Sequence, residues 1–321
     1  MAISATPLRT PAARRRGGNT GIRLNFGTSL AFVLPAAVLF AVFLLYPMVA
    51  AFSYSLFEWQ GTSQGAFAGI ENYVTLLTTS PYASSLWNAF SHNLLLFAGA
   101  VVFQNSLGLG IATLLHRRKR TKRLFQTIFT LPYLVSPMVI GYLWSLMLSP
   151  LFGPVNAIFR GVGLESLALP WLGDPNLAIW VIVFVTAWQW IGFPILLYGA
   201  AMGGIPEEID EAASLDGATS WKRFRWITVP MLVPAIGIIT VLTFIGSMES
   251  LAIPFALGGS TGAPAGSTDV MMLLFYRTAF ESGNANAIGI SSSLATVLFL
   301  FIFVISVVIV QGMRRAERKL F

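Results

Sequence analysis

The sequence contains no cysteine, which excludes disulfides, thiolate metal sites and cysteine nucleophiles. Its only two histidines, His92 and His116, argue against a histidine-based metal centre. No G-x-x-x-x-G-K-S/T or H-E-x-x-H pattern occurs, so the usual phosphate cradle and zinc-protease helix are missing. We therefore expect no catalytic residue, no metal site and no cofactor held by this chain.

Charged residues are also scarce, at 10% of the sequence, whereas hydrophobic residues make up 55%. A soluble domain carries about a quarter charged residues, so the composition indicates that most of this chain lies in lipid. The formal net charge of +7 raises nucleic acid as a partner. In a membrane protein, however, the distribution of charge matters more than its sum, and we expect lipid rather than nucleic acid.

Six apolar runs each reach the ~20 residues that cross a bilayer. The chain is therefore predicted to be an all-α, polytopic membrane protein with six transmembrane helices. The runs are residues 29–57, 88–115, 124–148, 177–202, 227–257 and 288–310. Prolines inside a membrane helix predict kinks, which neighbouring groups can accommodate. They are Pro35, Pro47, Pro132, Pro137, Pro194, Pro234 and Pro254.

Lysine and arginine lie almost entirely on one side of these runs. With the amino terminus inside, only Arg160 and Arg277 fall in outer segments, and the inner side holds 18 of the 20. The positive-inside rule therefore predicts that both termini are cytosolic. The predicted divisions are a disordered basic cytosolic tail (1–28), a transmembrane domain (29–315) and a cytosolic end (316–321).

A hydrophilic stretch, PEEIDEAASLDGATSWKRFRWITVP (206–230), separates the fourth and fifth runs. Pro206 suits the first turn of a helix, and the acids that follow lie near the positive end of its dipole. Gly217 is expected to end this helix, and Thr219 or Ser220 to cap a second short one. We therefore predict two short helices that meet at a glycine.

The small side chains of Ala212 and Ala213 predict a smooth surface suited to docking onto another protein, with an ordinary solvated loop as the alternative. The spacing resembles the EAA loop of the ABC-importer permease family, with Val229 where the family usually has Leu. The matching residues are Glu211-Ala212-Ala213, Gly217, Ile227 and Val229-Pro230. A pattern of this length with fixed gaps is specific.

Polar residues inside the apolar runs are candidates for a translocation path. Glu249 is the only acid well inside a run, and a charge there is costly unless it faces water or a partner. It either contacts substrate or forms a structural pair with a neighbouring helix. Weaker candidates, which serve equally well as helix contacts, are Ser247, Ser250, Gln189, Trp190 and the Gln104-Asn105 pair.

Other stretches resemble the maltose-type, sugar-uptake branch of the same family, and the likeness covers about residues 29–315. They include Gly69-Ile70-Glu71-Asn72-Tyr73, Trp171-Leu172-Gly173-Asp174-Pro175 and Tyr276-Arg277-Thr278-Ala279-Phe280. The resemblance implies the type I ABC-importer permease fold, with a cytosolic coupling loop at residues 203–228. It implies ATPase coupling through Glu211, Ala212, Ala213 and Gly217, beside which we place the acids Glu208 and Asp216.

The resemblance also implies a set of partners in the bacterial plasma membrane, where the chain is expected to be a multi-pass protein. These are a second related permease, two ABC ATPase subunits that bind ATP and magnesium, and an extracytoplasmic solute-binding protein. The expected cargo is a di- or oligosaccharide. Alternatives are a proton-coupled secondary transporter with Glu249 as the proton site, an ABC-exporter membrane half and a scaffold that moves no solute.

Overall fold

A computed structural model describes residues 26–116, 118 and 121–320. The chain divides into two compact units, Met1–Val49 and Ala50–Phe321. The tail predicted to be disordered at residues 1–28 lies, up to residue 25, outside the described residues.

The described part of the first unit is one apolar helical stretch. It comprises α1 (Phe26–Phe40), a π-helical segment (Ala41–Leu45) and the start of α2 (Tyr46–Tyr54). Ser29–Tyr54 has a mean hydropathy of 2.4 and is long enough to cross a membrane, in agreement with the predicted run. Pro35 lies inside α1.

Among the described residues, four helical stretches are long and apolar enough to span a membrane alone, and two bent pairs raise the number to six if each is one span. These six stretches correspond to the six predicted runs. The continuous ones are Ser29–Tyr54, Tyr82–His116, Val233–Gly258 and Ala287–Arg318; the bent pairs are Lys122–Leu134 with Pro137–Met147 and Pro175–Trp190 with Gly192–Met202.

The sharper bend separates α6 (Lys122–Leu134) from α7 (Pro137–Met147) by 92°. Pro137 cannot donate a backbone hydrogen bond, so the helix is interrupted before it, as the sequence predicts. A side-chain amide of a neighbouring helix compensates: Gln189 Nε2 donates to the carbonyl oxygen of Val135 at 3.0 Å. A backbone acceptor freed by the break is thereby satisfied.

The milder bend, 42°, separates α9 (Pro175–Trp190) from α10 (Gly192–Met202). A Cβ atom at Gly192 would lie 2.8 Å from the carbonyl oxygen of Phe129 on α6. Only glycine therefore permits this close approach between α10 and α6.

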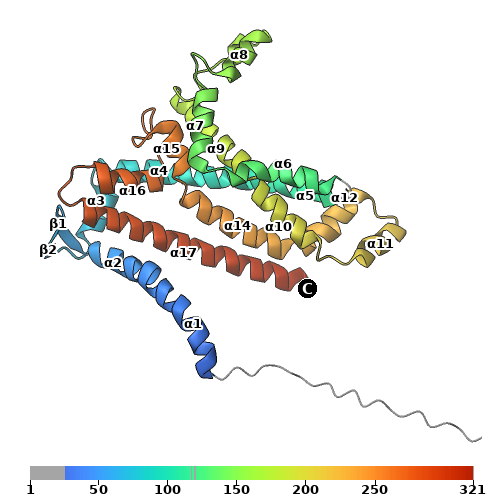
Figure 1. The fold of residues 1–321 in the computed structure, drawn as a ribbon, viewed down its shortest axis with the longest axis horizontal. Coiled ribbons are helices and arrows are strands. Elements are labelled where there is room, and N and C mark those ends of the chain that lie inside the picture. Colours follow the sequence, from blue (N-terminus) through green and yellow to red (C-terminus); the bar gives the residue numbers. More distant parts are fainter. Residues whose placement is uncertain (1–25, 117, 119–120, 321) are drawn as a thin grey trace, which may run out of the picture. The chain divides into compact units, whose positions relative to one another are not determined.

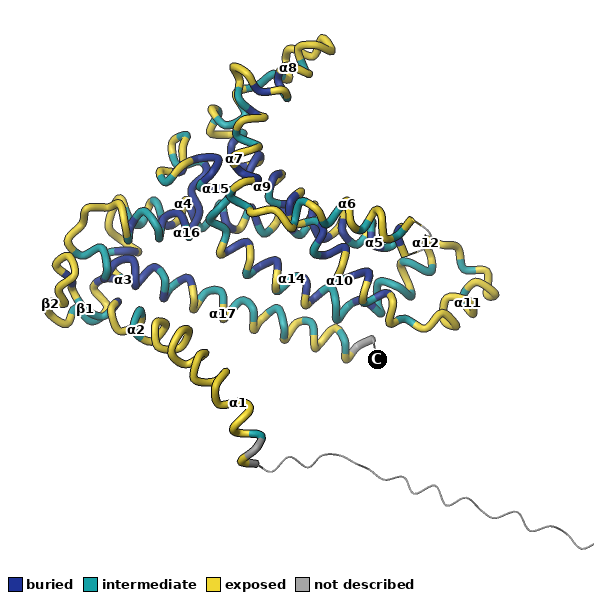
Figure 2. Tube along the Cα trace, in the orientation of Figure 1, coloured by how far each residue is buried: buried dark blue, intermediate teal, exposed yellow. Residues whose placement is uncertain are grey.

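The apolar core of the second unit is built from residues far apart in the chain. Ile182 of α9 packs with Ile253 of α15 (Ala252–Gly258) and Leu273 of α16 (Met271–Tyr276). Further along, Phe244 of α14 (Val233–Met248) packs with Leu294 of α17 (Ala287–Leu320), and these two helices lie side by side (Figure 1). Buried positions gather around α9 and α15 in Figure 2.

The remaining elements are shorter or join these helices. A hairpin of β1 (Phe57–Gln60) and β2 (Ser63–Phe67), which was not predicted, precedes α3 (Glu71–Thr78). The others are α4 (Tyr82–Gly99), a π-helical segment (Ala100–Asn105), α5 (Ser106–His116), α8 (Pro154–Gly161), a 3-10 turn (Glu165–Leu167), α11 (Glu207–Leu215), α12 (Ser220–Arg223), a π-helical segment (Phe224–Thr228), α13 (Val229–Met231) and a π-helical segment (Arg277–Glu281).

Asn72 explains how the hairpin is held. Its Nδ2 donates to the carbonyl oxygens of Ser55 and Phe57, each at 2.9 Å, and its Oδ1 accepts from Asn286 Nδ2 at 2.8 Å. One buried amide therefore joins the end of α2, β1 and the segment that enters α17.

Candidate functional site

The stretch 206–230, hereafter the elbow, has the predicted two-helix form. α11 ends at Leu215, and Gly217 adopts φ +74°, a conformation that favours glycine. The Ala218 amide donates to the Ala213 carbonyl at 2.9 Å, closing the helix end. Thr219 caps α12, because its Oγ1 accepts from the Lys222 amide at 3.4 Å. The prediction of two helices meeting at Gly217 is confirmed.

The elbow is mostly exposed (Figure 2) and contains no buried residue. It lies at the end of the second unit opposite the hairpin (Figure 1). Of the predicted coupling residues, Ala213 is half-buried and the rest are exposed; they are Glu208, Glu211, Ala212, Asp216 and Gly217.

Large apolar side chains add to this surface and were not singled out from the sequence. Leu215 is 90% exposed, Trp221 69% and Trp226 72%. Exposed apolar groups in an otherwise charged segment are typical of a surface that another protein covers. The signal was present in the sequence, since Leu215 interrupts a polar helix immediately before Asp216-Gly217.

An ion pair braces the elbow across its bend. Arg223 Nη1 lies 2.8 Å from Asp210 Oδ2, joining α12 to α11. The Asp210 side chain is 58% exposed and that of Arg223 is 19% exposed. The pair therefore restrains the angle between two short helices while its carboxylate faces water.

A second candidate region is a cavity of about 530 Å³ in the helical part of the second unit. Trp190 and Phe193 line it from the bend between α9 and α10, and Gln104 lines it from the π-helical segment after α4. The carboxyl end of α14 and the break before α15 complete the wall. The polar side chains there are Gln104, Thr186, Thr243, Ser247, Glu249 and Ser250.

The structure brings five of the predicted path residues to this cavity, namely Gln104, Trp190, Ser247, Glu249 and Ser250. Glu249 occupies the carboxyl-terminal cap of α14 and is exposed. Neither of the two ion pairs found in the described part of the chain includes it. A structural pair within this chain, the alternative for Glu249, is therefore not formed among those residues.

Gln189 and Asn105 lie elsewhere. Gln189 is 1% exposed, and its amide is directed to the α6–α7 break. Asn105 Nδ2 and Thr243 Oγ1 lie 3.2 Å apart, so Asn105 joins the segment after α4 to α14. Neither lines the cavity, whereas Gln104, beside Asn105, does.

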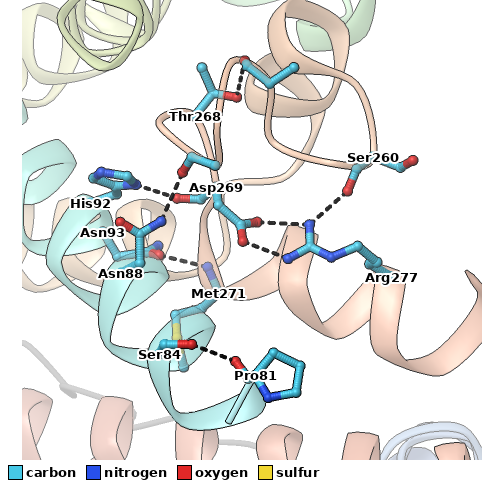
Figure 3. A network of polar contacts seen from close by, with 12 residues as sticks. Pro81, Ser84, Asn88, His92, Asn93, Ser260, Thr268, Asp269, Met271 and Arg277 are labelled. Atoms are coloured by element: carbon cyan, nitrogen blue, oxygen red, sulfur yellow. Dashed lines mark hydrogen bonds and ion pairs between the residues drawn. The ribbon is translucent and has the colours of Figure 1, made fainter. Parts of the chain in front are cut away.

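A polar network on the segment between α15 and α16 forms a third cluster (Figure 3). Asp269 pairs with Arg277 at 2.6 Å, and Arg277 Nη1 also donates to the Ser260 carbonyl at 2.8 Å. α4 holds the same segment, because Asn88 donates to the Gly266 carbonyl and His92 Nδ1 lies 2.8 Å from the Asp269 carbonyl.

Asp269 is only 4% exposed in its side chain. Burial raises the pKa of its carboxyl group, and the hydrogen bond and charge of Arg277 oppose that shift. The carboxylate is thus a desolvated charge stabilised mainly by Arg277, with smaller contributions from His92 and the Val270 amide.

Asn93, which the sequence did not single out, joins three helices. Its Nδ2 donates to the Ser247 carbonyl at 2.7 Å at the end of α14, and its Oδ1 accepts from the Met271 amide at 2.8 Å at the start of α16. The side chain is fully buried on α4. The only sequence signal is a polar residue within an apolar run, which does not indicate its partners.

Comparison with known proteins assigns the family. Residues 104–319 match the family described as "Binding-protein-dependent transport system inner membrane component". The chain is 29% identical over 277 residues to the "Probable starch degradation products transport system permease protein AmyD" of Thermoanaerobacterium thermosulfurigenes, covering 86% of this chain and 90% of that protein. It is 33% identical over 251 residues to the "Lactose transport system permease protein LacF" of Rhizobium radiobacter, covering 78% and 82%.

A solved structure shares the fold. The match is to a chain of a bacterial alginate ABC transporter, determined in complex with an alginate pentasaccharide-bound periplasmic protein. The TM-score is 0.74 at 24% identity, over 91% of this chain and 94% of that chain. With its apolar helices, its elbow and a family match over more than half its length, the chain belongs to the inner membrane components of binding-protein-dependent transport systems.

Proposed function

We propose that this chain is a transmembrane permease subunit of an ATP-driven importer that takes up a di- or oligosaccharide. An extracytoplasmic solute-binding protein delivers the cargo, and two ABC ATPase subunits bind ATP and magnesium and supply the energy. A second, related permease completes the pathway in the bacterial plasma membrane. The names of the relatives AmyD and LacF, which refer to starch products and lactose, support a saccharide cargo.

The observation that carries this proposal is the elbow, a mostly exposed pair of short helices that contains no buried residue. Asp210–Arg223 and the positive φ of Gly217 restrain its shape. A rigid projection of this kind transmits a displacement, whereas a flexible loop would absorb it. In the proposed orientation the elbow faces the cytosol, together with most of the basic residues, and Glu208, Glu211, Ala212, Ala213, Asp216 and Gly217 contact an ATPase subunit.

The cavity supports the carbohydrate part of the proposal. Trp190 and Phe193 offer apolar faces, and the hydroxyl and carboxylate groups of Ser247, Ser250 and Glu249 offer hydrogen bonds. Ligand sites commonly combine apolar walls with a few polar groups that orient the ligand. Sugar rings present both an apolar face and hydroxyl groups, so this chemistry suits them.

The test is uptake into vesicles that contain the complete transporter, with its binding protein outside and ATP inside. We expect saccharide uptake to require both ATP and the binding protein, and to continue when an uncoupler removes the proton gradient. Uptake that collapses with the uncoupler while ATP stays high would contradict the proposal and support a proton-coupled transporter using Glu249. A complex that moves no solute under any of these conditions would support the scaffold alternative.

A further inference from the structure

The side chains that line the described wall of the cavity include one carboxylate and no basic group. Glu249 is the only charged residue that lines it, and no lysine, arginine or histidine contributes to the described wall. The two ion pairs among the described residues are Asp210–Arg223 and Asp269–Arg277, and neither of them includes the Glu249 carboxylate.

The backbone contributes further negative charge next to Glu249. α14 ends at Met248, and Glu249 follows at its cap, so the negative end of the helix dipole lies where this carboxylate begins. The Asn93 amide donates to the carbonyls of Ser247 and Met248, at 2.7 and 3.3 Å. Because this amide is neutral, it satisfies the carbonyls without supplying a compensating cation.

The aromatic wall of the cavity supplies no positive charge that would offset Glu249. Trp190 and Phe193 present aromatic rings, whose faces attract cations and accept apolar C–H groups. The other polar side chains are neutral amides and hydroxyls. Both sides of the cavity therefore favour a neutral or positively charged ligand over an anion.

We propose that the Glu249 wall selects the charge of the cargo, admitting neutral and amino-bearing oligosaccharides and rejecting those that carry carboxylates. This inference rests on the proposed function, since it takes the cavity as part of a saccharide path. Neutral hydroxyls and ammonium groups donate charge-assisted hydrogen bonds to Glu249, whereas a sugar carboxylate meets a like charge there. The alginate importer shares the fold and is described with an acidic polysaccharide as its cargo, so the fold itself does not set this preference.

The experiment measures equilibrium binding to the purified, complete transporter without nucleotide and without the binding protein. Two pairs of probes differ in charge and retain the same sugar ring: trigalacturonate against its methyl ester, and the glucosamine trimer against the N-acetylglucosamine trimer. We expect the wild-type complex to bind the neutral ester at least about tenfold more tightly than trigalacturonate, which corresponds to about 1.4 kcal/mol. The glucosamine trimer should bind at least as tightly as its neutral counterpart.

Variants assign the effect to one side chain. Glu249→Gln, which keeps nearly the same shape, should remove most of the preference within each pair, and Glu249→Lys should reverse it. Glu165→Lys is the matched control, because Glu165 is exposed and does not line the cavity. Co-purification with the ATPase subunits shows that each variant is assembled.

Two outcomes overturn the inference while leaving the proposed function in place. One is equal binding of trigalacturonate and its ester by the wild-type complex. The other is a preference that Glu249→Lys leaves unchanged. If none of the four probes binds and the vesicles take up only a non-saccharide solute, the proposed function fails and the inference fails with it.

Discussion

Two ion pairs among the described residues have similar nitrogen–oxygen distances but lie in different surroundings. Asp210–Arg223 in the elbow closes at 2.8 Å with its carboxylate side chain 58% exposed. Asp269–Arg277 closes at 2.6 Å with its carboxylate side chain 4% exposed. The same chemical contact therefore has different consequences, because water stabilises the charge of Asp210 when the pair opens and reaches Asp269 very little.

The difference separates two kinds of region. The elbow contains no buried residue, so its shape depends on helix caps, Gly217 and one exposed ion pair. The Asp269 segment is held by the side chains of Asn88 and His92 from α4 and by Arg277. We infer that the elbow can be altered with small effects on folding and large effects on coupling, and that the Asp269 segment behaves in the opposite way.

The largest effect on stability is expected for Arg277→Met. This change leaves the Asp269 carboxylate buried without its cation, and removing one partner of a buried pair costs about 3–5 kcal/mol. Thermal unfolding of the purified complex measures the loss. The double variant Asp269→Leu with Arg277→Met should recover much of it, since neither charge then remains buried. An Arg277→Met protein that unfolds at the wild-type temperature would remove the contrast between the two pairs.

A smaller change in folding free energy, with a large change in transport, is expected for Gly217→Val. Nothing lies within 4 Å of a Cβ atom built at Gly217, so the cost comes from its φ of +74° and amounts to about 1–2 kcal/mol. ATP hydrolysis by the assembled complex should continue while uptake falls. Gly110→Val is the control, because that helical position is equally open and has no positive φ. Wild-type uptake by assembled Gly217→Val complexes would show that the bend need not be rigid.

Substitutions on the outer surface of the elbow should weaken binding of the ATPase and leave insertion of the permease into the membrane unchanged. Glu211→Lys reverses the charge of an exposed residue, and Ala213→Asp places a charge on the small-residue surface. Either change should weaken association with the ATPase subunits by about fivefold to tenfold, or roughly 1–1.4 kcal/mol. Co-purification at graded ATPase concentrations measures this association. Undiminished association of both variants would contradict the proposed contact.

The smallest effect is expected for Asp210→Asn. An exposed ion pair is worth about 0.2–1 kcal/mol, so unfolding should shift little, in contrast to Arg277→Met. The variant should still lower the ratio of transport to hydrolysis, because the brace between α11 and α12 is weakened. Raising the salt concentration should also lower the ratio of transport to hydrolysis in the wild-type protein, and should lower it less in Asp210→Asn. Equal salt dependence of the two proteins would contradict the role of this ion pair as a brace.

Much of the elbow was predictable because its structure depends on neighbouring residues. Pro206, Gly217 and Thr219 each act through the conformation or hydrogen bonds of the next few residues, and the structure confirms the two helices and the cap by Thr219. Apolar run length likewise predicted the membrane-spanning stretches. Pro137 predicted an interruption, although nothing local indicated that it would bend the chain by 92°.

The cavity shows what local reasoning could not supply. Glu249 and Trp190 were candidates because of their residue types, but so were Gln189 and Asn105, which bind Val135 and Thr243 instead. The sequence could not show which of these four residues line the cavity. Adjacent residues on a helix point in different directions, and the packing of the neighbouring helices decides which of them faces a cavity. The hairpin at residues 57–67 was also unforeseen, and Asn72 and Asn286, far apart in the chain, hold it in place.

The sequence by itself determined the apolar helices, the asymmetric placement of basic residues and the local form of the elbow, because each depends on composition or on residues a few positions apart. Only the tertiary structure decided which polar side chains share the cavity, that Asn93 on α4 caps α14, and that Asp269 is buried against Arg277. Those contacts join helices that are distant in sequence, and their geometry follows from how the helices pack.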